Sequence, residues 1–530
     1  MDMITLAPTQ TNSPTLPPEH LLRATGTLRL VLVINLGSFV DPADADMFRH
    51  LRGSESFAAA IRGLQPQAPF QLDAEQAAVE RTGYDLRIFR SRLIYNHFFP
   101  TYRAGWDADM RQLMASQGCA NVGRWTRWTP RLRLTRNGLA MITLDLPLED
   151  MPLIACTEQL LELPSRPGDC APQDQWALGM LMLEAFLRSI GRQITVATGE
   201  YRGKIRFTDA TQFKHTVRLD RYVVYTLRKI TRGDIILTPE QLKREYAPTI
   251  ATFMEGVMIE RGGVRSYPSY GGSHASDLMA NDVSTWDDEL CLFTGESALL
   301  YVPLITSSMA YLGGPRGLDL EAYPTYWKGI MRGIEHLIAF RSEAQQIERR
   351  TTDLLVSIPG LTHKVTDGYL SKSDIALLDH LATSLSDIFD VLPELRSMAI
   401  SASAFRADYV RHKFEHLIGK LAIEETLDLV NTNVEQLNFF LSYYNDMRLQ
   451  WQGQRTNVLG ITLGVIVGFM AISSFLADTF NVVDGFDKHH SVIITIVVAV
   501  VGLGLLAAAI RIARKRFERK LHRPSRPPSR

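Results

Sequence analysis

The chain has 530 residues, enough for more than one domain, and its 46% apolar and 22% charged residues are ordinary for a folded protein. The formal charge is zero overall, but nine Lys/Arg and one Glu give residues 511–530 a net charge of +8, which leaves −8 on residues 1–510. Cys119, Cys156, Cys170 and Cys291 stand far apart, which excludes a CxxC redox motif, a zinc ribbon and a disulfide scaffold and is typical of a reducing compartment.

Residues 1–25 are polar and rich in Pro and Thr, and we interpret them as a disordered lead-in without a signal-peptide pattern. Residues 26–320 alternate strand-like and helix-like segments, which predicts an α/β domain. Leu28–Leu36 is typical of a buried strand, and Arg131–Leu146 of a hairpin with a type I′ turn at Asn137-Gly138. Further strands are expected at residues 222–230, 256–267 and 290–304, and a helix at 175–190.

The stretch GRWTRWTPRLRLTR, residues 123–136, combines arginines with Trp125 and Trp128 and contains no acidic residue. Guanidinium groups bind phosphates and indoles stack on bases, so the stretch is a candidate site for an anionic ligand such as a nucleotide. The candidate residues are Arg124, Arg127, Arg131 and Arg133. The alternative is the outward face of a strand whose leucines point inward.

Residues 321–393 predict a helical pair, at about 327–356 and 374–391, separated by a break at Pro359-Gly360. Residues 394–455 contain no proline and carry apolar residues in alternating steps of three and four, as in a coiled coil. The register slips between Leu421 and Leu427, as a stutter would make it do. We expect one continuous stalk helix that packs against copies of itself; the alternative is a shorter helix broken at Gly419 or Gly453.

Two uncharged runs, residues 456–477 and 491–510, are each long enough to span a bilayer. They flank an acidic loop at 478–490 and precede the basic tail at 511–530. The positive-inside rule therefore predicts a multi-pass protein of the inner (plasma) membrane with both termini in the cytoplasm. Because two spans cannot easily enclose a pathway, a pore would need an oligomer, most simply a ring.

One stripe of the first run is small or polar, and the remaining positions are mostly bulky. In a ring of helices this stripe would line the axial path. The candidate pore-lining residues are Asn457, Gly460, Gly464, Val467, Ala471 and Ser474. The alternative is a packing face without a pore.

A long helix that leads into two C-terminal hydrophobic runs, with a short loop and a basic tail, resembles the CorA metal-ion transporter superfamily. Its Gly-Met-Asn motif corresponds here to Thr479-Phe480-Asn481, of which the asparagine is kept. The segment Gln454–Thr462 also resembles the family's junction between stalk and membrane. The resemblance covers roughly residues 395–515 and implies a funnel-like homopentamer whose first span lines the pore.

The resemblance also implies site residues. Asn481 would place a ring of amide oxygens at the pore mouth, where Mg²⁺ is selected with its water shell intact. Asp478, Asp484 and Asp487 would raise the local cation concentration. The helical pair could hold regulatory divalent ions at Asp374, Asp379, Asp387 and Asp390. The alternative for this second set is a solvated acidic face.

The sequence therefore favours a CorA-like channel for Mg²⁺ or a related divalent cation, gated by its cytosolic domain. The alternative is a CorA-like effector pore opened by a signalling nucleotide in antiviral defence, and a third possibility is a scaffold without conduction. The expected partners are other copies of the chain and the lipid bilayer, with a nucleotide ligand in the effector alternative, but no nucleic acid. The sequence contains no Walker loop, Rossmann fingerprint, HExxH motif or nucleophile elbow. We therefore do not expect an enzyme.

Overall fold

The computed structural model describes most of the chain before residue 448 and forms two compact units. The described residues are 18–73, 98–106, 108–116, 122–161, 176–197, 202–210, 220–261, 264–268, 272–303, 322–367, 371–399 and 408–447, with the single residues 449 and 464. The first unit comprises Met1–Gln346 and Val391–Asp428, and the second comprises Ile347–Asp390 and Leu429–Arg530.

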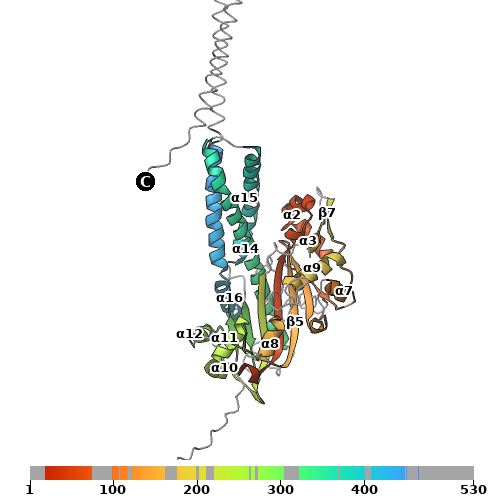
Figure 1. The fold of residues 1–530 in the computed structure, drawn as a ribbon, viewed down its shortest axis with the longest axis vertical. Helices are drawn as coiled ribbons and strands as arrows, with labels where there is room; N and C mark the ends of the chain where they lie inside the picture. Colours follow the sequence, from red (N-terminus) through yellow and green to blue (C-terminus); the bar gives the residue numbers. More distant parts are fainter. Residues whose placement is uncertain are drawn as a thin grey trace, which may run out of the picture. The chain divides into compact units, whose positions relative to one another are not determined.

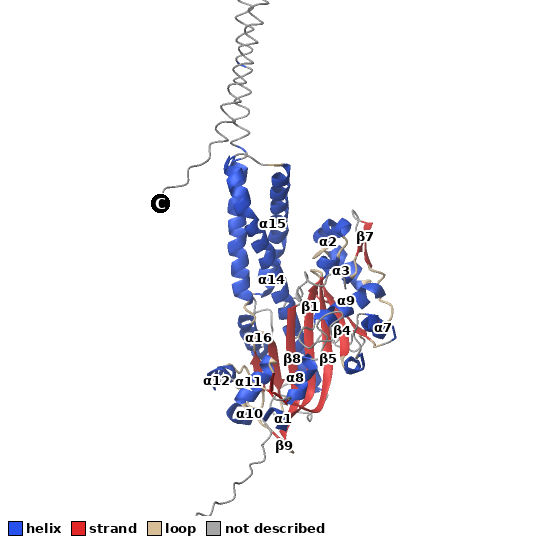
Figure 2. Cartoon of the chain, viewed as in Figure 1, coloured by secondary structure: helices blue, strands red, loops and turns tan. Residues whose placement is uncertain are grey.

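A nine-stranded sheet forms the centre of the first unit (Figure 2). Its strands are β1 (Leu22–Asn35), β2 (Phe70–Leu72), β3 (Phe98–Ala104), β4 (Thr129–Thr135), β5 (Leu139–Pro152), β8 (Asp220–Arg232), β9 (Ile235–Ile236), β12 (Leu290–Phe293) and β13 (Ser297–Tyr301). The order is β12-β13-β8-β1-β5-β4-β3-β2, with β9 paired to β8. Only the β13–β8 pairing among these strands is parallel, so the sheet is mixed.

The alternation of residue types along the strands decides which side of the sheet each residue faces. In β1, Leu28, Leu30 and Leu32 belong to the main apolar core, whereas Arg29 points to the opposite side, because successive side chains of a strand alternate. The predicted hairpin of β4 and β5 is confirmed, but its turn is not type I′. Of the two turn residues only Gly138 has a positive φ, of 79°, and its N–H donates to the carbonyl of Thr135.

Helices of the first unit cover the apolar side of the sheet. They include α8 (Leu153–Leu161), α9 (Trp176–Ser189) and α11 (Ala247–Glu255). Phe186 of α9 packs edge-on against Phe70 with ring centroids 5.3 Å apart. The ring centroids of Phe253 of α11 and Tyr225 are 4.1 Å apart. The predicted helix at 175–190 and the strands at 222–230 and 290–304 are thereby confirmed.

Shorter elements complete the first unit. The helices are α1 (Pro18–Leu21), α2 (Ala45–Leu51), α3 (Glu55–Arg62), α7 (Ala108–Ser116), α10 (Pro239–Glu245) and α12 (Gly272–Ala280), with 3₁₀ turns η1 (Leu36–Phe39), η2 (Pro42–Asp44) and η3 (Val122–Arg127). Two hairpins stand apart from the sheet: β6 (Gln193–Ala197) with β7 (Arg202–Arg206), and β10 (Ile259–Arg261) with β11 (Val264–Ser266).

The predicted break at Pro359-Gly360 is wrong, because α14 (Ala322–Asp367) runs through both residues. A proline removes one helical hydrogen bond, but neighbouring turns can carry the helix onward. Pro359 leaves the Leu355 carbonyl without its helical N–H donor, and the helix continues on both sides of this one missing bond. The second member of the pair is α15 (Lys372–Ala399), which extends beyond the predicted end at about residue 391.

The single stalk helix expected from about residue 395 is also wrong. The described residues contain α16 (Asp408–Lys420) and a further helix at residues 423–447, which lies beside α14 and α15 in Figure 1. Ala422 separates the two with a φ of 50°. The slip in the apolar register between Leu421 and Leu427 therefore marks the end of one helix and the start of another, rather than a stutter.

The expected membrane fold requires a correction. No helix in the part of the chain that the structure describes is long and apolar enough to cross a membrane. The 46-residue α14 has the length, but charged residues such as Glu335, Arg341 and Glu343 recur along it. This finding contradicts the two-span fold class with its funnel-like arrangement, and with it the multi-pass localisation at the inner membrane; both expectations are withdrawn. The ranges 456–477, 478–490, 491–510 and 511–530 lie outside the described residues, apart from Gly464.

Candidate functional site

The side of the sheet opposite the apolar core carries a connected set of charged side chains. We call it the arginine–carboxylate network; its members are Arg29, Arg131, Arg133, Asp73, Asp145 and Glu335. Three positive and three negative side chains balance each other. The network joins strands β1, β4 and β5 to α14 and lies wholly within the first unit.

Asp145 lies at the centre of one half of the network. Its two carboxylate oxygens accept hydrogen bonds from Arg29, with Nε–Oδ1 at 2.6 Å and Nη2–Oδ2 at 2.8 Å, and Arg131 pairs with the same carboxylate. Arg131 also donates to Asp73 at 2.8 Å. Arg29 and Asp145 are direct partners in the β1–β5 register, so the antiparallel pairing itself places them side by side.

Glu335 of α14 lies between two guanidinium groups in the other half. Its Oε1 accepts from Arg29 Nη1 at 2.7 Å, and its Oε2 accepts from Arg133 Nη1 at 3.1 Å. Arg133 also donates to the hydroxyl of Thr101 at 2.8 and 3.0 Å, across the β3–β4 pair. The side chains of Glu335 and Arg133 are only 4% and 6% exposed. Two arginines thus hold a buried carboxylate much as they would hold a phosphate.

The electrostatics favour the charged forms of Arg29 and Asp145. Burial alone would raise the pKa of Asp145, but the charges and hydrogen bonds of Arg29 and Arg131 outweigh it and hold that pKa below its usual value. Burial alone would lower the pKa of Arg29, and Asp145 and Glu335 instead raise it. A buried pair of this kind is costly to break, because removing one partner leaves the other charge without compensation.

Three more polar contacts hold α14 on the sheet. Arg341 forms a two-pronged ion pair with Asp220, with Nε–Oδ2 at 3.0 Å and Nη2–Oδ1 at 2.5 Å. Asn137, at the β4–β5 turn, donates to Glu343 at 3.0 Å. Asn35, at the end of β1, donates to Gln346 at 2.5 Å. The first half of α14 is therefore fixed by polar contacts as well as by apolar packing.

A second buried ion pair attaches α16 to the edge of the sheet. Lys413 and Glu289 are both fully buried, and Lys413 Nζ donates to Glu289 Oε2 at 3.1 Å, to the Val283 carbonyl at 2.9 Å and to Thr285 Oγ1 at 3.0 Å. Burial raises the pKa of Glu289 although Lys413 acts in the opposite direction. Next to this pair, Phe414 packs directly onto Gly333 of α14.

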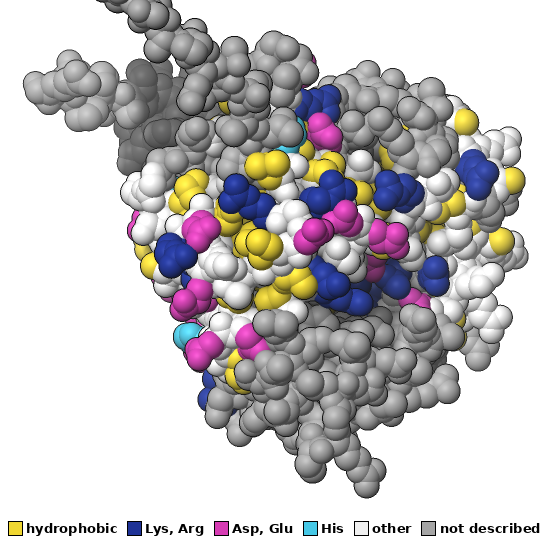
Figure 3. All heavy atoms as spheres, turned by 90° about the horizontal axis from the view of Figure 1, so that it is seen from below, with side chains coloured by type: hydrophobic (Ala, Val, Ile, Leu, Met, Phe, Trp, Pro, Cys, Tyr) yellow, Lys and Arg dark blue, Asp and Glu magenta, His cyan; other side chains and the backbone are white. Residues whose placement is uncertain are grey.

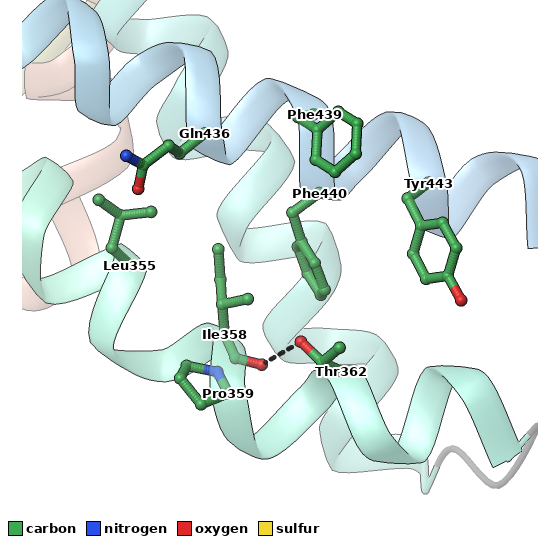
Figure 4. Close-up of a pocket in the computed structure, with 8 residues that line it drawn as sticks. All are labelled: Leu355, Ile358, Pro359, Thr362, Gln436, Phe439, Phe440 and Tyr443. Carbon is green, nitrogen blue, oxygen red and sulfur yellow. Dashed lines mark hydrogen bonds between the residues drawn. The ribbon is translucent and has the colours of Figure 1, made fainter.

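The second unit contains an apolar groove, with a volume of about 530 Å³, between α14 and the helix at residues 423–447 (Figure 4). Its lining residues are Leu355, Ile358, Pro359, Thr362, Gln436, Phe439, Phe440 and Tyr443. None of the eight has a charged side chain. Within the same unit, Asn433 donates to the hydroxyls of Thr351 and Thr352 at 3.1 and 3.3 Å, which fixes the register of the two helices.

The structure separates the four arginines proposed for anion binding. Arg131 and Arg133 are neutralised by carboxylates, as described above. Arg127 is exposed at the end of η3, and Arg124 lies in the same turn. Trp125 and Trp128 are buried in the apolar core, so neither indole is available for stacking on a base. Figure 3 shows basic and acidic side chains interspersed on the face that it displays, rather than gathered into the basic surface typical of nucleic-acid binding.

The acidic residues proposed for metal regulation all lie on α15. Asp374 accepts from Lys364 at 2.8 Å and caps the helix through Ser371, and these hydrogen bonds lower its pKa to about 2. Asp379 is exposed, and only the backbone positions of Asp387 and Asp390 are described. The described residues include no group of three or more His, Cys, Asp or Glu side chains that could hold a metal ion.

The proposed pore and selectivity residues lie outside the described residues, with one exception. These are Asn457, Gly460, Val467, Ala471, Ser474, Asp478, Asn481, Asp484 and Asp487. Gly464 is helical and exposed. Their roles remain predictions.

Sequence reasoning missed Glu335, Lys413 and Glu289. Two of them left a signal: Glu335 follows Ile334 and precedes Leu337, and Lys413 precedes Phe414, so each is a charge at the margin of an apolar stripe. Comparison with protein-family models, with curated proteins and with solved structures gave no match.

Proposed function

We propose that the chain takes part in divalent-cation transport as a CorA-like protein, with the first unit as its regulatory part. The order of elements supports this proposal: a mixed sheet, then the long helices α14 and α15, then a long helix with an apolar seam. The resemblance implies the same order. The transported or regulatory ion would be Mg²⁺ or a related divalent cation.

The observation that carries the regulatory role is the attachment of α14 to the sheet. Glu335, Arg341 and Glu343 all bind partners on the sheet side through polar contacts. Such contacts can switch between two arrangements, since each charged group can exchange its present partner for an ion or a ligand. A purely apolar contact would offer no such exchange. The first unit can therefore respond to a charged ligand through a long helix.

Uptake by cells that lack their own magnesium transporters tests the transport proposal. The full chain should restore growth at low Mg²⁺, and Asn481→Ala and Asp478→Ala should each reduce uptake. Asn445→Ala, at an exposed position of the helix at 423–447, is the matched control and should leave uptake unchanged. Failure of the unaltered, expressed chain to raise Mg²⁺, Co²⁺ or Ni²⁺ uptake would refute the proposal.

A second candidate is a CorA-like effector opened by a signalling nucleotide in antiviral defence. The observation that favours it is the cradle of Arg29 and Arg133, which holds the carboxylate of Glu335 in the way that it could hold a phosphate. In this proposal Glu335 is an internal competitor of the ligand, and the nucleotide displaces it from the two guanidinium groups.

Thermal-shift titration of the full chain distinguishes the two candidates. Cyclic and linear oligonucleotides are compared with Mg²⁺, Zn²⁺ and inorganic phosphate. If the second candidate holds, the increase in melting temperature caused by the nucleotide should be larger in Glu335→Gln, because this variant removes the internal carboxylate charge. Glu348→Gln, on the same helix but outside the network, serves as the control. Absence of a nucleotide shift in both the unaltered chain and Glu335→Gln would discard the second candidate and leave the first untouched.

A further inference from the structure

The groove of the second unit is open and bordered by protruding apolar side chains. Phe439 lines it and is 76% exposed, whereas its neighbour Phe440 is only 6% exposed. Figure 4 shows the two rings projecting in different directions from the helix, with that of Phe440 directed toward α14. An aromatic ring that is largely exposed beside an apolar hollow is costly in water, because exposed apolar area carries a free-energy penalty of about 25 cal/mol per Å².

Exposed apolar side chains are concentrated on this unit. Among the described residues, ten large apolar side chains are exposed, and six of them belong to the second unit, which has far fewer described residues than the first. These six are Val356, Ile375, Phe389, Leu429, Phe439 and Leu449. Leu429 also lies on the groove side, since it precedes Gln436 and Tyr443 by seven and fourteen residues, which returns to the same helix face. Exposed apolar side chains at this density on a small unit are typical of a protein that uses part of its surface for interaction.

The charges around the groove indicate what covers it. The helix at residues 423–447 carries five acidic residues and no Lys or Arg, but none of the five falls between Glu435 and Asp446. A basic partner would be drawn to the acidic stretches of this helix rather than to its uncharged part. The uncharged part, in contrast, can meet an identical surface without charge repulsion.

We infer that the groove is the contact surface for a second copy of this chain, with the Phe439 ring of one copy seated in the groove of the other. The surface presents both a protruding ring and a hollow large enough for one, so it can complement itself. Val356, 73% exposed on α14, and Leu429, 47% exposed on the same helix as Phe439, add exposed apolar area to the two helices that form the groove. Phe439 would thus be the anchor residue of a contact surface that is otherwise apolar, as is usual for a binding hot spot.

The mass of the purified full chain in solution tests this inference. Light scattering after size exclusion, over a hundredfold range of concentration, should give a multiple of the 59.6 kDa chain mass that falls toward a single copy on dilution. Phe439→Glu should weaken association roughly tenfold or more, since it places a charge in the contact. Phe439→Leu should retain it.

Ile235→Glu is the matched control, because Ile235 is an exposed apolar residue, 65% exposed, on β9 of the first unit. It should leave the mass unchanged. Circular dichroism of each variant verifies that the fold is kept, which we expect because both side chains are exposed. A single-copy mass for the unaltered chain at every concentration, or equal masses for Phe439→Glu and the unaltered chain, would overturn the inference and leave the groove to a different occupant. Neither readout depends on ion uptake.

Discussion

Gly333 of α14 is the position where the packing of α16 can be tested most directly. A Cβ at this position would lie 2.6 Å from Cε1 and Cε2 of Phe414 and closer still to Cζ. Phe414 is fully buried, and its Cζ must retreat by about 1.5 Å to regain ordinary carbon–carbon contact of ~3.5 Å. Gly333→Ala therefore forces the two helices apart or distorts the ring.

Two opposing contributions set the size of the effect. Alanine in place of glycine inside a helix stabilises it by about 1 kcal/mol. Overpacking a buried contact costs about 1–3 kcal/mol. Because the overlap at Gly333 involves three atoms of a ring that has no space beside it, we expect the second contribution to dominate. The free energy of unfolding should therefore fall, by up to about 2 kcal/mol.

Gly360, on the same helix, provides the control, since a Cβ built there meets nothing within 4 Å. Gly360→Ala should raise the free energy of unfolding by about 0.5–1 kcal/mol. Urea denaturation followed by circular dichroism measures both. Adding Phe414→Leu to Gly333→Ala should recover part of the loss, so that the double variant costs less than the sum of the single changes. If Gly333→Ala stabilises the protein as much as Gly360→Ala does, the described packing of α16 is incorrect.

The Lys413–Glu289 ion pair, the helix junction at Ala422 and the buried side of His416 each give a further prediction. Lys413→Met leaves the buried Glu289 carboxylate without its partner and should lower the free energy of unfolding by about 3–5 kcal/mol, whereas the double variant with Glu289→Gln should recover part of that loss. If urea denaturation gives the single and the double variant the same free energy of unfolding, the two residues do not form a direct pair. Ala422→Gly should raise the free energy of unfolding by about 1 kcal/mol, because glycine adopts the φ of 50° without strain; a loss would argue against the break at this residue. Burial, together with Lys420 and His412, lowers the pKa of His416. A lowered histidine pKa means that stability is lost as pH falls below 6.5, so the melting temperature should drop more steeply toward pH 5.5 in the unaltered chain than in His416→Gln; parallel curves would contradict this.

Strands such as β1, β4, β5 and β8 were predictable because their signal is local, whereas β2, β3, β6, β7 and β9 were not predicted. Leu132 and Leu134 alternate with Arg131 and Arg133, and this alone indicates a strand with one apolar side. The turn type expected from Asn137-Gly138 was wrong, and the side chain of Asn137 has a partner that no local pattern indicates: it donates to Glu343, 206 residues away. Distant contacts decide such details.

The helices and the candidate site were harder to predict for the same reason. Pro359 usually ends a helix, yet α14 continues, because packing of the turns on either side outweighs one missing hydrogen bond. The slip after Leu421 was visible in the sequence, but a stutter and a break leave the same pattern. The carboxylate of Glu335 contacts Arg29 and Arg133, from which 306 and 202 residues separate it along the chain. No local pattern encodes that meeting.

The attachment of α16 also determines how the protein fails when it is warmed. All four residues of β12, the strand at one end of the sheet, are buried, and α16 packs beside it while Lys413 reaches into the loop that precedes it. The loop itself closes the outer edge of β12: the Val283 N–H donates to the Cys291 carbonyl at 3.0 Å, and the Cys291 N–H donates to Asp282 and Ser284. A strand whose outer edge loses such partners is a template on which another strand can add. If α16 detaches first, the loop loses its contacts with Lys413 and can leave the β12 edge. Molecules in that state would associate through their β12 edges before the rest of the sheet unfolds, so turbidity should rise before the strand signal is lost, and cooling should return only part of the protein.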